Sequence, residues 1–519
     1  MIKISSNKVE FKDAPNPYWI ASTPETNYPT LQEDINVDVA IVGGGMVGIT
    51  SAYLLGKEGL KVAVVEADRI LHGTTGHTTA KITSQHSLIY ARLKKEMGEE
   101  KAGQYAEANE SAIHTIADII EKNKIDCNLM WRPAYVYTQS DKYLKDIEDE
   151  MKAAVSLGIK AAYIKEVPLP FAIKAAVRFD NQAQFHPLKY LKALAAVISE
   201  GGGLIFEQTR AINIEMDNNR VVITNSGKKI RADKVIIASH FPFFDGGGLY
   251  FSRIYAERSY VVGVTIKEKF PEAMFISAED PVRSLRSQSF EDGELILVGG
   301  DHHKTGHCDN TNIHYTNLID FAKSNFQVQD IPYRWSTQDC MTMDGVPYVG
   351  HLTSQSPNIY VATGFGKWGM TNSTAAAMIL RDLITKGDNP WASIYNPTRF
   401  PNIKNLIVQN ADVAVNYVSG KLDAGADNEE IVKGQAEVIN VDGKLAGAYR
   451  DEDDKLHILD ITCTHMGCEL HWNAAETSWD CPCHGSRFDF EGRIIEGPAL
   501  NNLKRIEEGP NKVEPNVYQ

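Results

Sequence analysis

The most regular hydrophobic pattern in the chain begins at residue 37. Residues 37–42 (VDVAIV) are mostly β-branched or apolar, as in a strand buried within a parallel sheet, and a glycine-rich turn and an apolar stretch to about Lys57 follow. This order predicts a strand, a tight turn and a helix. Residues 61–66 (KVAVVE) predict a second strand. A late stretch repeats the order, with a strand at 358–363, a glycine turn at 364–370 and a helix from Thr371 to about Leu383.

The sequence between these two stretches predicts helices and then strands. Isoleucines recur at helical spacing within 85–125, where we expect two helices, and Pro187 opens another helix that ends at a run of three glycines. Short strands are expected across 204–238, and strand-like alternation covers 245–335. The histidine-rich segment 301–307 follows two glycines between strands, so we expect a hairpin loop there rather than an iron site.

The C-terminal part of the chain changes character. Apolar residues at helical spacing predict a helix at 402–418, and the Gly- and Asp-rich residues 420–428 predict a linker. From Glu429 onward, short alternating runs predict antiparallel strands. The expected domains are an N-terminal arm (1–36), a first domain (37–390, with inserts at about 85–180 and 245–335), a linker with a helix (391–428) and a small all-β domain (429–519).

Length and charge narrow the possible functions. With 519 residues and 43% hydrophobic composition, the chain can bury two or three separate cores. Its formal net charge of -14 makes nucleic acid a poor partner. The first residues lack a secretion signal, and no run of about 20 apolar residues free of glycine occurs. We therefore expect a cytoplasmic protein without a membrane anchor.

The glycine turn after the first strand has the spacing of a dinucleotide site. Gly43, Gly45 and Gly48 fit G-x-G-x-x-G, in which the first glycine allows the turn, the second lets a pyrophosphate approach the backbone and the third lets helix and strand pack. Glu66 ends the next strand 18 residues after Gly48, where an acid can hold ribose hydroxyls. Both FAD and NAD use this arrangement. The turn residues expected to contact the cofactor are Gly43, Gly45, Met46, Val47 and Gly48.

The late strand, glycine turn and helix point to FAD. Together with the segment 344–350 (DGVPYVG), they resemble the FAD-dependent family that includes glycine oxidase, sarcosine oxidase and D-amino-acid oxidases. The resemblance covers 37 to about 390 and implies an α/β Rossmann-like FAD-binding domain with a mixed α+β substrate domain. The pair Ser239-His240 departs from the family, where a glycine usually follows the strand ending at Ala238. The resemblance implies further flavin contacts at Thr74, Thr75, Gly76, His77, Thr78, Asp344, Gly364, Gly366, Lys367, Trp368, Gly369, Met370 and Thr371.

Several side chains are candidates for the substrate site. Lys367 and Trp368 lie in the turn that the resemblance places against the flavin, where either can shape the substrate pocket or tune the ring; Trp368 can equally belong to the core. Guanidinium groups bind carboxylates through two parallel hydrogen bonds, which makes Arg286 and Arg258 candidates for carboxylate capture together with Tyr260, although exposed strand arginines are common. Cys340 lies near where sarcosine oxidases link a cysteine to the flavin.

Two short loops near the C-terminus carry cysteine and histidine. CTHMGC at 463–468 and CPCHGS at 481–486 together offer two thiolates and two imidazoles. This ligand set holds a 2Fe-2S cluster whose second iron takes histidines. A structural zinc site uses the same four ligands, but zinc does not explain the additional cysteine in each loop or the Gly485-Ser486 pair.

The double loop resembles the Rieske iron-sulfur family. The resemblance implies that the ligands are Cys463, His465, Cys481 and His484. It also implies a disulfide between Cys468 and Cys483 that joins the two loops. Ser486 matches the family's hydroxyl donor to a bridging sulfide. Phe488 stands where many high-potential members carry a tyrosine, and the loss of one hydrogen bond to sulfur should lower the reduction potential.

The two motif sets together predict an enzyme that turns a two-electron oxidation into one-electron output. We expect an FAD-dependent dehydrogenase that oxidises a C-N bond of an amine or amino acid and passes electrons through the Rieske cluster to an external protein or quinone-like acceptor. The alternatives are a flavin and Rieske electron-transfer reductase fed by a redox partner, and a component of an oxygenase system. A second dinucleotide fingerprint, which direct NADH use requires, is not visible. The substrate, the acceptor and the oligomeric state do not follow from the sequence.

Overall fold

The computed structural model describes residues 14–216, 220–399, 410–417 and 431–506. These residues form two compact units. The first contains the described residues up to His303 and those from Asn312 to Arg399; the second contains Lys304–Thr311 and the described residues from Asn410 onward.

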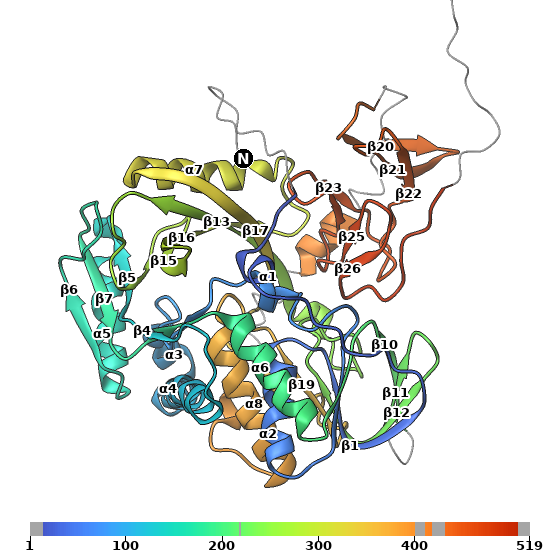
Figure 1. Ribbon diagram of the computed structural model, residues 1–519, viewed down its shortest axis with the longest axis horizontal. Helices are drawn as coiled ribbons and strands as arrows, with labels where there is room; N and C mark the ends of the chain where they lie inside the picture. Colours follow the sequence, from blue (N-terminus) through green and yellow to red (C-terminus); the bar gives the residue numbers. More distant parts are fainter. Residues whose placement is uncertain (1–13, 217–219, 400–409, 418–430, 507–519) are drawn as a thin grey trace, which may run out of the picture. The chain divides into compact units, whose positions relative to one another are not determined.

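The first sheet of the first unit is mixed, with parallel strands at its core and antiparallel strands added to them (Figure 1). Strand β1 (Ile35–Val42) pairs in parallel with β2 (Val62–Val65) on one side and with β12 (Lys229–Ile237) on the other. Their Val, Ile and Ala side chains are almost entirely buried, as expected for strands covered on both faces. The sheet is completed by β9 (Leu204–Phe206), β19 (Ile359–Thr363), β18 (Tyr348–His351), β10 (Ala211–Met216) and β11 (Arg220–Thr224).

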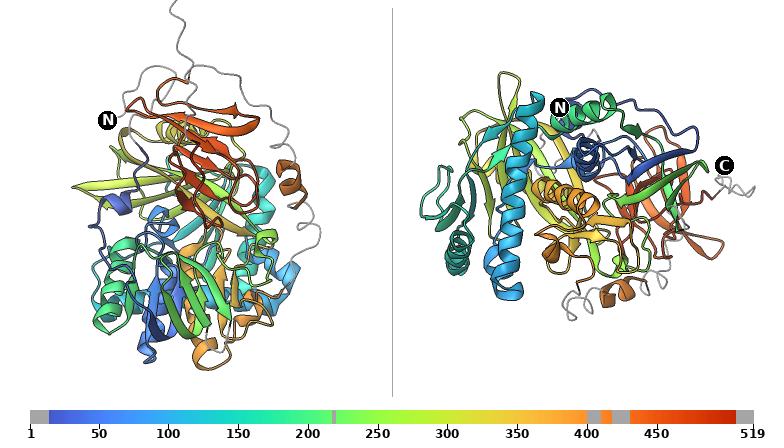
Figure 2. Two further views of the ribbon diagram at one scale, coloured as in Figure 1. Left: turned by 90° about the vertical axis from the view of Figure 1, so that its right-hand side faces the viewer. Right: turned by 90° about the horizontal axis from the view of Figure 1, so that it is seen from below.

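Helices cover one face of this sheet. Helix α2 (Met46–Lys57) packs against both α6 (Pro187–Glu200) and α8 (Gly369–Thr385), and the long α4 (Glu99–Asn123) lies beside α8 (Figures 1 and 2). Helix α6 starts with Pro187 at its first position, where the missing amide hydrogen costs nothing. The predicted strand, turn and helix order is therefore confirmed at both ends of the domain. Two of the expected insert helices are α3 (Tyr90–Met97) and α4.

A second sheet of the first unit is mainly antiparallel. In order, its strands are β17 (Val328–Thr342), β13 (Ile254–Ile266), β16 (Gly293–Lys304), β15 (Arg283–Phe290), β14 (Met274–Ser277), β5 (Ala134–Thr138), β7 (Ala175–Phe179) and β6 (Ala161–Ile164). Helix α7 (Asn312–Asn325) packs on β13 and β17, and α5 (Leu144–Ser156) packs on β5, β6 and β7 (Figure 1). Smaller elements are α1 (Tyr18–Ala21), α9 (Ala392–Tyr395) and a three-stranded sheet of β3 (Lys81–Ile82), β8 (Ala183–Gln184) and β4 (Met130–Trp131).

The prediction of a hairpin loop at 301–307 is wrong for residues 301–304, which belong to strand β16. Strand β16 continues to Lys304, and Gly300 (φ +134°) and Asp301 (φ +51°) lie within it with positive φ values. The Asp301 carboxylate is held there by Arg283 at 2.8 Å and by His314 at 2.7 Å. Only residues 410–417 of the helix predicted at 402–418 are among the described residues, and these are helical. The linker predicted at 420–428 lies outside the described residues.

Residues 431–506 of the second unit form two small antiparallel sheets, and the prediction of an all-β domain there is confirmed. Trp479 is fully buried between them, and a side chain at Gly447 would come within 2.4 Å of its ring, so the glycine is required by close packing. The strands are β20 (Ala436–Val441), β21 (Lys444–Arg450) and β22 (Leu456–Asp460) in one sheet, and β23 (His471–Asn473), β24 (Ser478–Asp480), β25 (Arg487–Asp489) and β26 (Ile494–Glu496) in the other.

Candidate functional site

The three motif glycines between β1 and α2 have different surroundings. A Cβ atom on Gly43 would lie 2.4 Å from the Ala238 carbonyl oxygen, and one on Gly48 would lie 1.9 Å from the Gly43 carbonyl oxygen. Both glycines are therefore required by the packing of helix on strands. A Cβ atom on Gly45 would meet only the Thr75 hydroxyl, at 3.3 Å. The backbone at Gly45 is thus open on one side, which is the space that a pyrophosphate needs at a helix N-terminus.

Glu66 lies beside this turn. Its carboxylate accepts hydrogen bonds from the Gly44 amide at 2.7 Å and from the Asp68 amide at 3.1 Å. Burial raises the pKa of Glu66, and the two amide bonds offset part of that effect. A carboxylate fixed at the end of β2 suits the ribose role predicted for it, and that role remains a prediction.

The small-residue loop at 73–80 is tied to both sheets of the first unit. Thr75 accepts a hydrogen bond from the Met46 amide at 3.1 Å, and Thr74 donates to the Gln338 carbonyl at 3.1 Å. The Trp335 indole, on β17, donates to the His77 carbonyl at 2.8 Å. The loop thus connects the glycine turn to the inner face of the second sheet, and this face is called the loop-facing face below.

His240, part of the departure from the family pattern, also holds this loop. It adopts a left-handed conformation (φ +65°), and its ring nitrogens lie 3.3 Å from the Thr74 hydroxyl and 3.3 Å from the Cys340 amide. Thr363, at the end of β19, donates to the His240 carbonyl. His240, in the stretch where the family usually has a glycine, therefore connects the end of β12 to β17 and to the small-residue loop through hydrogen bonds.

The start of α8 is organised around a buried histidine that sequence reasoning missed. His86 stacks on Trp368 with ring centroids 5.1 Å apart, and its Nε2 lies 3.0 Å from the Thr371 hydroxyl. Its Nδ1 lies 2.6 Å from the Tyr105 hydroxyl. Because burial lowers the pKa of His86 to about 3, the ring is neutral at physiological pH. His86 therefore fixes Trp368 and the first turn of α8 without adding charge.

Asp344 and Lys367, two predicted cofactor contacts, take part in ion pairs. Arg399 binds the Asp344 carboxylate with two nitrogens at 2.8 and 3.0 Å. Burial alone would raise the pKa of Asp344, but Arg399 more than reverses this effect, so the net shift is downward. Lys367 pairs with Glu257 of β13 at 3.1 Å. The flavin roles of both residues remain predictions.

The second sheet separates the substrate-site candidates. Tyr260 lies on the α7 face, where its ring stacks on His314 at 4.7 Å and its hydroxyl lies 2.9 Å from His303. Arg286 lies on the loop-facing face, where it donates to the Thr79 and Ala80 carbonyls at 3.1 and 2.7 Å. The structure therefore does not bring Tyr260 and Arg286 together.

Lys81 is a second basic group beside Arg286 that sequence reasoning missed. Its ammonium contacts the Ser284 hydroxyl. Burial, and then the nearby Arg286 charge, lower the pKa of Lys81 to about 7, and burial lowers that of Arg286 to about 9. The only signal in the sequence is that Lys81 directly follows the small-residue loop. Because burial disfavours the charged forms of Lys81 and Arg286, an anionic group bound beside them would be stabilised.

The cysteine and histidine loops of the second unit meet at one point. The Cys463 and Cys481 thiols hydrogen-bond each other, which lowers the pKa of Cys463 and raises that of Cys481. The His465 and His484 rings lie next to each other with centroids 5.0 Å apart. Burial, followed by the neighbouring His465, lowers the pKa of His484 to about 4, so its ring is neutral, as metal binding requires. The loops therefore bring the two thiols together and the two imidazoles together, and the role of these four residues as cluster ligands remains a prediction.

The remaining cysteines and Ser486 surround these ligands. Cys468 and Cys483 form the predicted disulfide, with an S–S distance of 2.10 Å. The three sulfurs of Cys468, Cys481 and Cys483 lie within 4.8 Å of one another, and two of them form this bond. The role of Cys481 as a cluster ligand remains a prediction. The Ser486 hydroxyl accepts from the Ala499 amide at 3.0 Å and hydrogen-bonds the Cys463 sulfur. Its role as the hydroxyl donor to a bridging sulfide remains a prediction.

Comparison with known proteins decides what these sites hold. Residues 38–383, more than half of the chain, match the family model "FAD dependent oxidoreductase". The chain belongs to this family. In this FAD-dependent oxidoreductase, residues 424–507 also match the model of the Rieske [2Fe-2S] domain. The open backbone at Gly45 and the paired thiols and imidazoles fit FAD and a Rieske 2Fe-2S cluster, so both cofactor predictions are confirmed and the zinc alternative is set aside.

Relatives extend over both parts of this flavoprotein. It is 45% identical over 500 residues to the putative Rieske 2Fe-2S iron-sulfur protein YhfW of Bacillus subtilis (strain 168), covering 96% of this chain and 98% of the relative. It is 25% identical over 414 residues to the gamma-glutamylputrescine oxidoreductase of Escherichia coli (strain K12), covering 74% of this chain and 92% of that protein. The crystal structure of glycine oxidase from Geobacillus kaustophilus aligns with a TM-score of 0.60 at 18% identity, covering 71% of this chain and all of that one.

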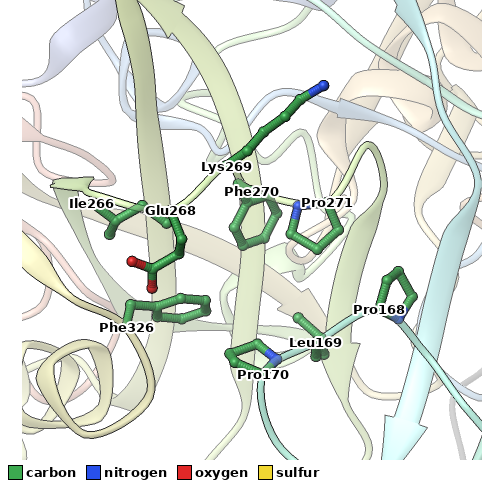
Figure 3. Close-up of a pocket in the computed structure, with 9 residues that line it drawn as sticks. All are labelled: Pro168, Leu169, Pro170, Ile266, Glu268, Lys269, Phe270, Pro271 and Phe326. Atoms are coloured by element: carbon green, nitrogen blue, oxygen red, sulfur yellow. The ribbon is translucent and has the colours of Figure 1, made fainter.

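Among the described residues, no helix is both long enough and apolar enough to cross a membrane. A pocket of about 310 Å³ lies at the end of β13 (Figure 3). Its lining is mainly apolar, with Phe270 and Phe326 on facing sides and Glu268 beside them. It shares no residue with the flavin or cluster sites, and we assign it no role in the reaction.

Proposed function

We propose that this flavoprotein oxidises a C-N bond of an amine or amino acid and delivers the electrons through its Rieske cluster to an external acceptor, acting as a dehydrogenase rather than an oxidase. The observation that carries the proposal is that one chain matches both the FAD dependent oxidoreductase family and the Rieske [2Fe-2S] domain. FAD supplies two-electron oxidation and the 2Fe-2S cluster supplies one-electron transfer. A chain that combines FAD with a 2Fe-2S cluster suits an acceptor that takes one electron at a time.

The amine class is supported by relatives and by the chain's own polar groups. The matched relatives include a gamma-glutamylputrescine oxidoreductase, and the fold resembles that of glycine oxidase. Ser259 and Thr337 stand directly opposite each other on β13 and β17. Ser259 lies two residues from Val261 on β13, and Thr337 lies two residues from Trp335 on β17. The Trp335 indole donates a hydrogen bond to the 73–80 loop. Side chains alternate along a strand, so both hydroxyls belong to the loop-facing face.

These two hydroxyls are available to a ligand. Both are buried, and neither has a hydrogen-bond partner among the described residues. Buried polar atoms are nearly always paired, so an unpaired pair on one face is the arrangement expected of a site that a polar substrate completes. A substrate amine can donate to both oxygens and be held in one orientation. We therefore assign Ser259 and Thr337 to substrate binding, with Glu257 and Lys367 on the same face.

The test is an anaerobic titration of the purified protein with a panel of amino acids and methylated amines. Flavin absorbance and the low-temperature EPR signal of the reduced cluster are followed together. One compound that bleaches the flavin while the cluster signal grows supports the proposal. Reduction by dithionite alone would overturn the amine assignment. Oxygen uptake in air at a rate equal to the rate with an artificial one-electron acceptor would make the protein an oxidase.

Two variants test the substrate surface. Ser259→Ala and Thr337→Val should each raise the substrate concentration for half-maximal flavin reduction about 5- to 13-fold, because one hydrogen bond contributes about 1–1.5 kcal/mol. The matched control is Thr265→Val, which lies near the end of β13, the strand that carries Ser259. Equal behaviour of all three variants would remove Ser259 and Thr337 from the site.

A further inference from the structure

A short segment of the flavoprotein sequence is built into the cluster-binding unit. Residues 304–311 (KTGHCDNT) connect β16 to α7, two elements of the first unit, yet they belong to the second. The chain therefore passes between the units after His303 and again before Asn312, more than a hundred residues before the first strand of the second unit.

Hydrogen bonds join this segment to three parts of the second unit. The His307 Nε2 lies 3.1 Å from the Pro482 carbonyl oxygen, which only accepts, so the ring nitrogen donates. The Gly306 carbonyl accepts from the His471 ring at 2.6 Å, and the Thr311 hydroxyl accepts from the Ala475 amide at 2.9 Å. These bonds connect the segment to the second cluster loop, to the start of β23 and to the turn after it. Lys304 adds an ion pair with Asp412.

Gly306 shows how closely the segment approaches the cluster loop. Its φ of +74° lies in the left-handed region, and a Cβ atom there would be 2.7 Å from the Pro482 nitrogen and 3.1 Å from the Cys481 carbonyl carbon. Both atoms are backbone, so the clash could not be relieved by rotating a side chain. Pro482 stands between the predicted ligand Cys481 and the disulfide residue Cys483. The segment therefore contacts the loop at its most constrained point.

We propose that residues 304–311 form a third loop of the cluster site, with Gly306 and His307 as positioning residues for the 481–486 loop. Gly306 fixes the distance between the two backbones, and His307 fixes the direction of the Pro482 carbonyl, which determines how the peptide groups around Cys481 are oriented. Amide groups that point at the ligand sulfur tune the electronic properties of the cluster. The inference rests on the Rieske assignment and not on the identity of the substrate.

The first test compares two alanine substitutions in the full-length protein. Gly306→Ala combines left-handed strain with the clash against Pro482, whereas Gly443→Ala has the same strain (φ +80°) in the β20–β21 turn and meets nothing within 4 Å. Iron and acid-labile sulfide per chain, the EPR spectrum of the dithionite-reduced cluster and its midpoint potential are measured. Gly306→Ala should lose part of its iron or shift the spectrum and potential, and Gly443→Ala should match the parent. Matching values for both variants would overturn the proposal.

The second test concerns His307 and does not rely on a clash. His307→Ala removes the donor to Pro482, whereas His307→Gln keeps an amide that can donate at a similar position. We expect the alanine variant to shift the EPR spectrum and potential and the glutamine variant to restore them towards the parent values. If His307→Ala leaves both unchanged, the hydrogen bond does not position the loop. FAD content serves as the fold control, and substrate is not needed, so failure here is distinguishable from failure of the amine assignment.

Discussion

Alanine at Gly48 should lower the stability of the fold, whereas alanine at Gly45 should weaken the binding of FAD, although both glycines belong to one motif. A methyl group at Gly48 would lie 1.9 Å from the Gly43 carbonyl oxygen, so α2 would have to move away from the end of β1. A methyl group at Gly45 would meet only the Thr75 hydroxyl at 3.3 Å, and the backbone there (φ -79°, ψ -169°) suits any residue. The first change therefore disturbs the fold, and the second fills the space left for FAD.

The expected magnitudes follow from these distances. Overpacking costs about 1–3 kcal/mol, and the clash at Gly48 is with backbone, so we expect Gly48→Ala to reach at least the upper end of that range. Gly45→Ala places alanine at the N-cap of α2, which costs about 0.5–1 kcal/mol. Blocking the approach of a charged phosphate to backbone donors removes about 1.5–3 kcal/mol of binding, which corresponds to about 10- to 150-fold weaker FAD affinity.

The assay measures the two quantities separately. Urea unfolding of FAD-free protein gives stability, and titration of the same protein with FAD gives affinity from the change in flavin fluorescence. The reasoning is refuted if Gly45→Ala binds FAD as tightly as the parent. It is equally refuted if Gly45→Ala destabilises the FAD-free protein as much as Gly48→Ala does, because the space at Gly45 would then be needed by the fold.

Three further outcomes are expected. Ser486→Ala removes a hydrogen bond to the Cys463 sulfur and should lower the cluster's midpoint potential in an EPR-monitored redox titration; an unchanged potential would exclude this role. Replacing Cys468 and Cys483 together by serine should speed the loss of iron to a chelator several-fold, because the clamp between the loops is gone; equal rates would show that the disulfide is not needed for retention. Burial raises the pKa of Glu150 from 4.5 to about 7, so its contribution to stability is complete below about pH 4.5 and is lost as the pH rises through about 7. The urea stability should fall over this range by up to about 3 kcal/mol, and Glu150→Gln should flatten the slope.

The parts of the molecule that sequence reasoning predicted depend on local patterns. The strand at 37–42, the glycine turn and α2 follow from side-chain periodicity and glycine spacing within about 20 residues. The cysteine and histidine loops follow from a ligand set whose chemistry permits few alternatives. Each of these features is encoded in residues that are neighbours in sequence, so the prediction did not require knowledge of the tertiary fold.

The features that sequence reasoning missed arise from contacts between distant residues. His86 lies among insert residues, and only packing brings it against Trp368 and Thr371 of α8. The sequence predicts the strand that contains Tyr260. It does not show which face of that strand lies against the small-residue loop at 73–80, because this depends on the packing of the second sheet. The extension of β16 beyond Gly300 likewise depends on Arg283 and His314, which hold Asp301 in place.

The segment at 304–311 has a consequence for biosynthesis. It is made well before its partners, since 175 residues separate His307 from Pro482 and 165 separate Gly306 from His471. At about 5–20 residues per second, a ribosome needs roughly 10–35 s to cover that distance. During this interval the flavoprotein part can fold around its own sheets while the segment still lacks its partners. The cluster site can therefore be completed only after the second cysteine loop has been made, and a chain truncated before that loop should present an unfinished surface to chaperones and proteases.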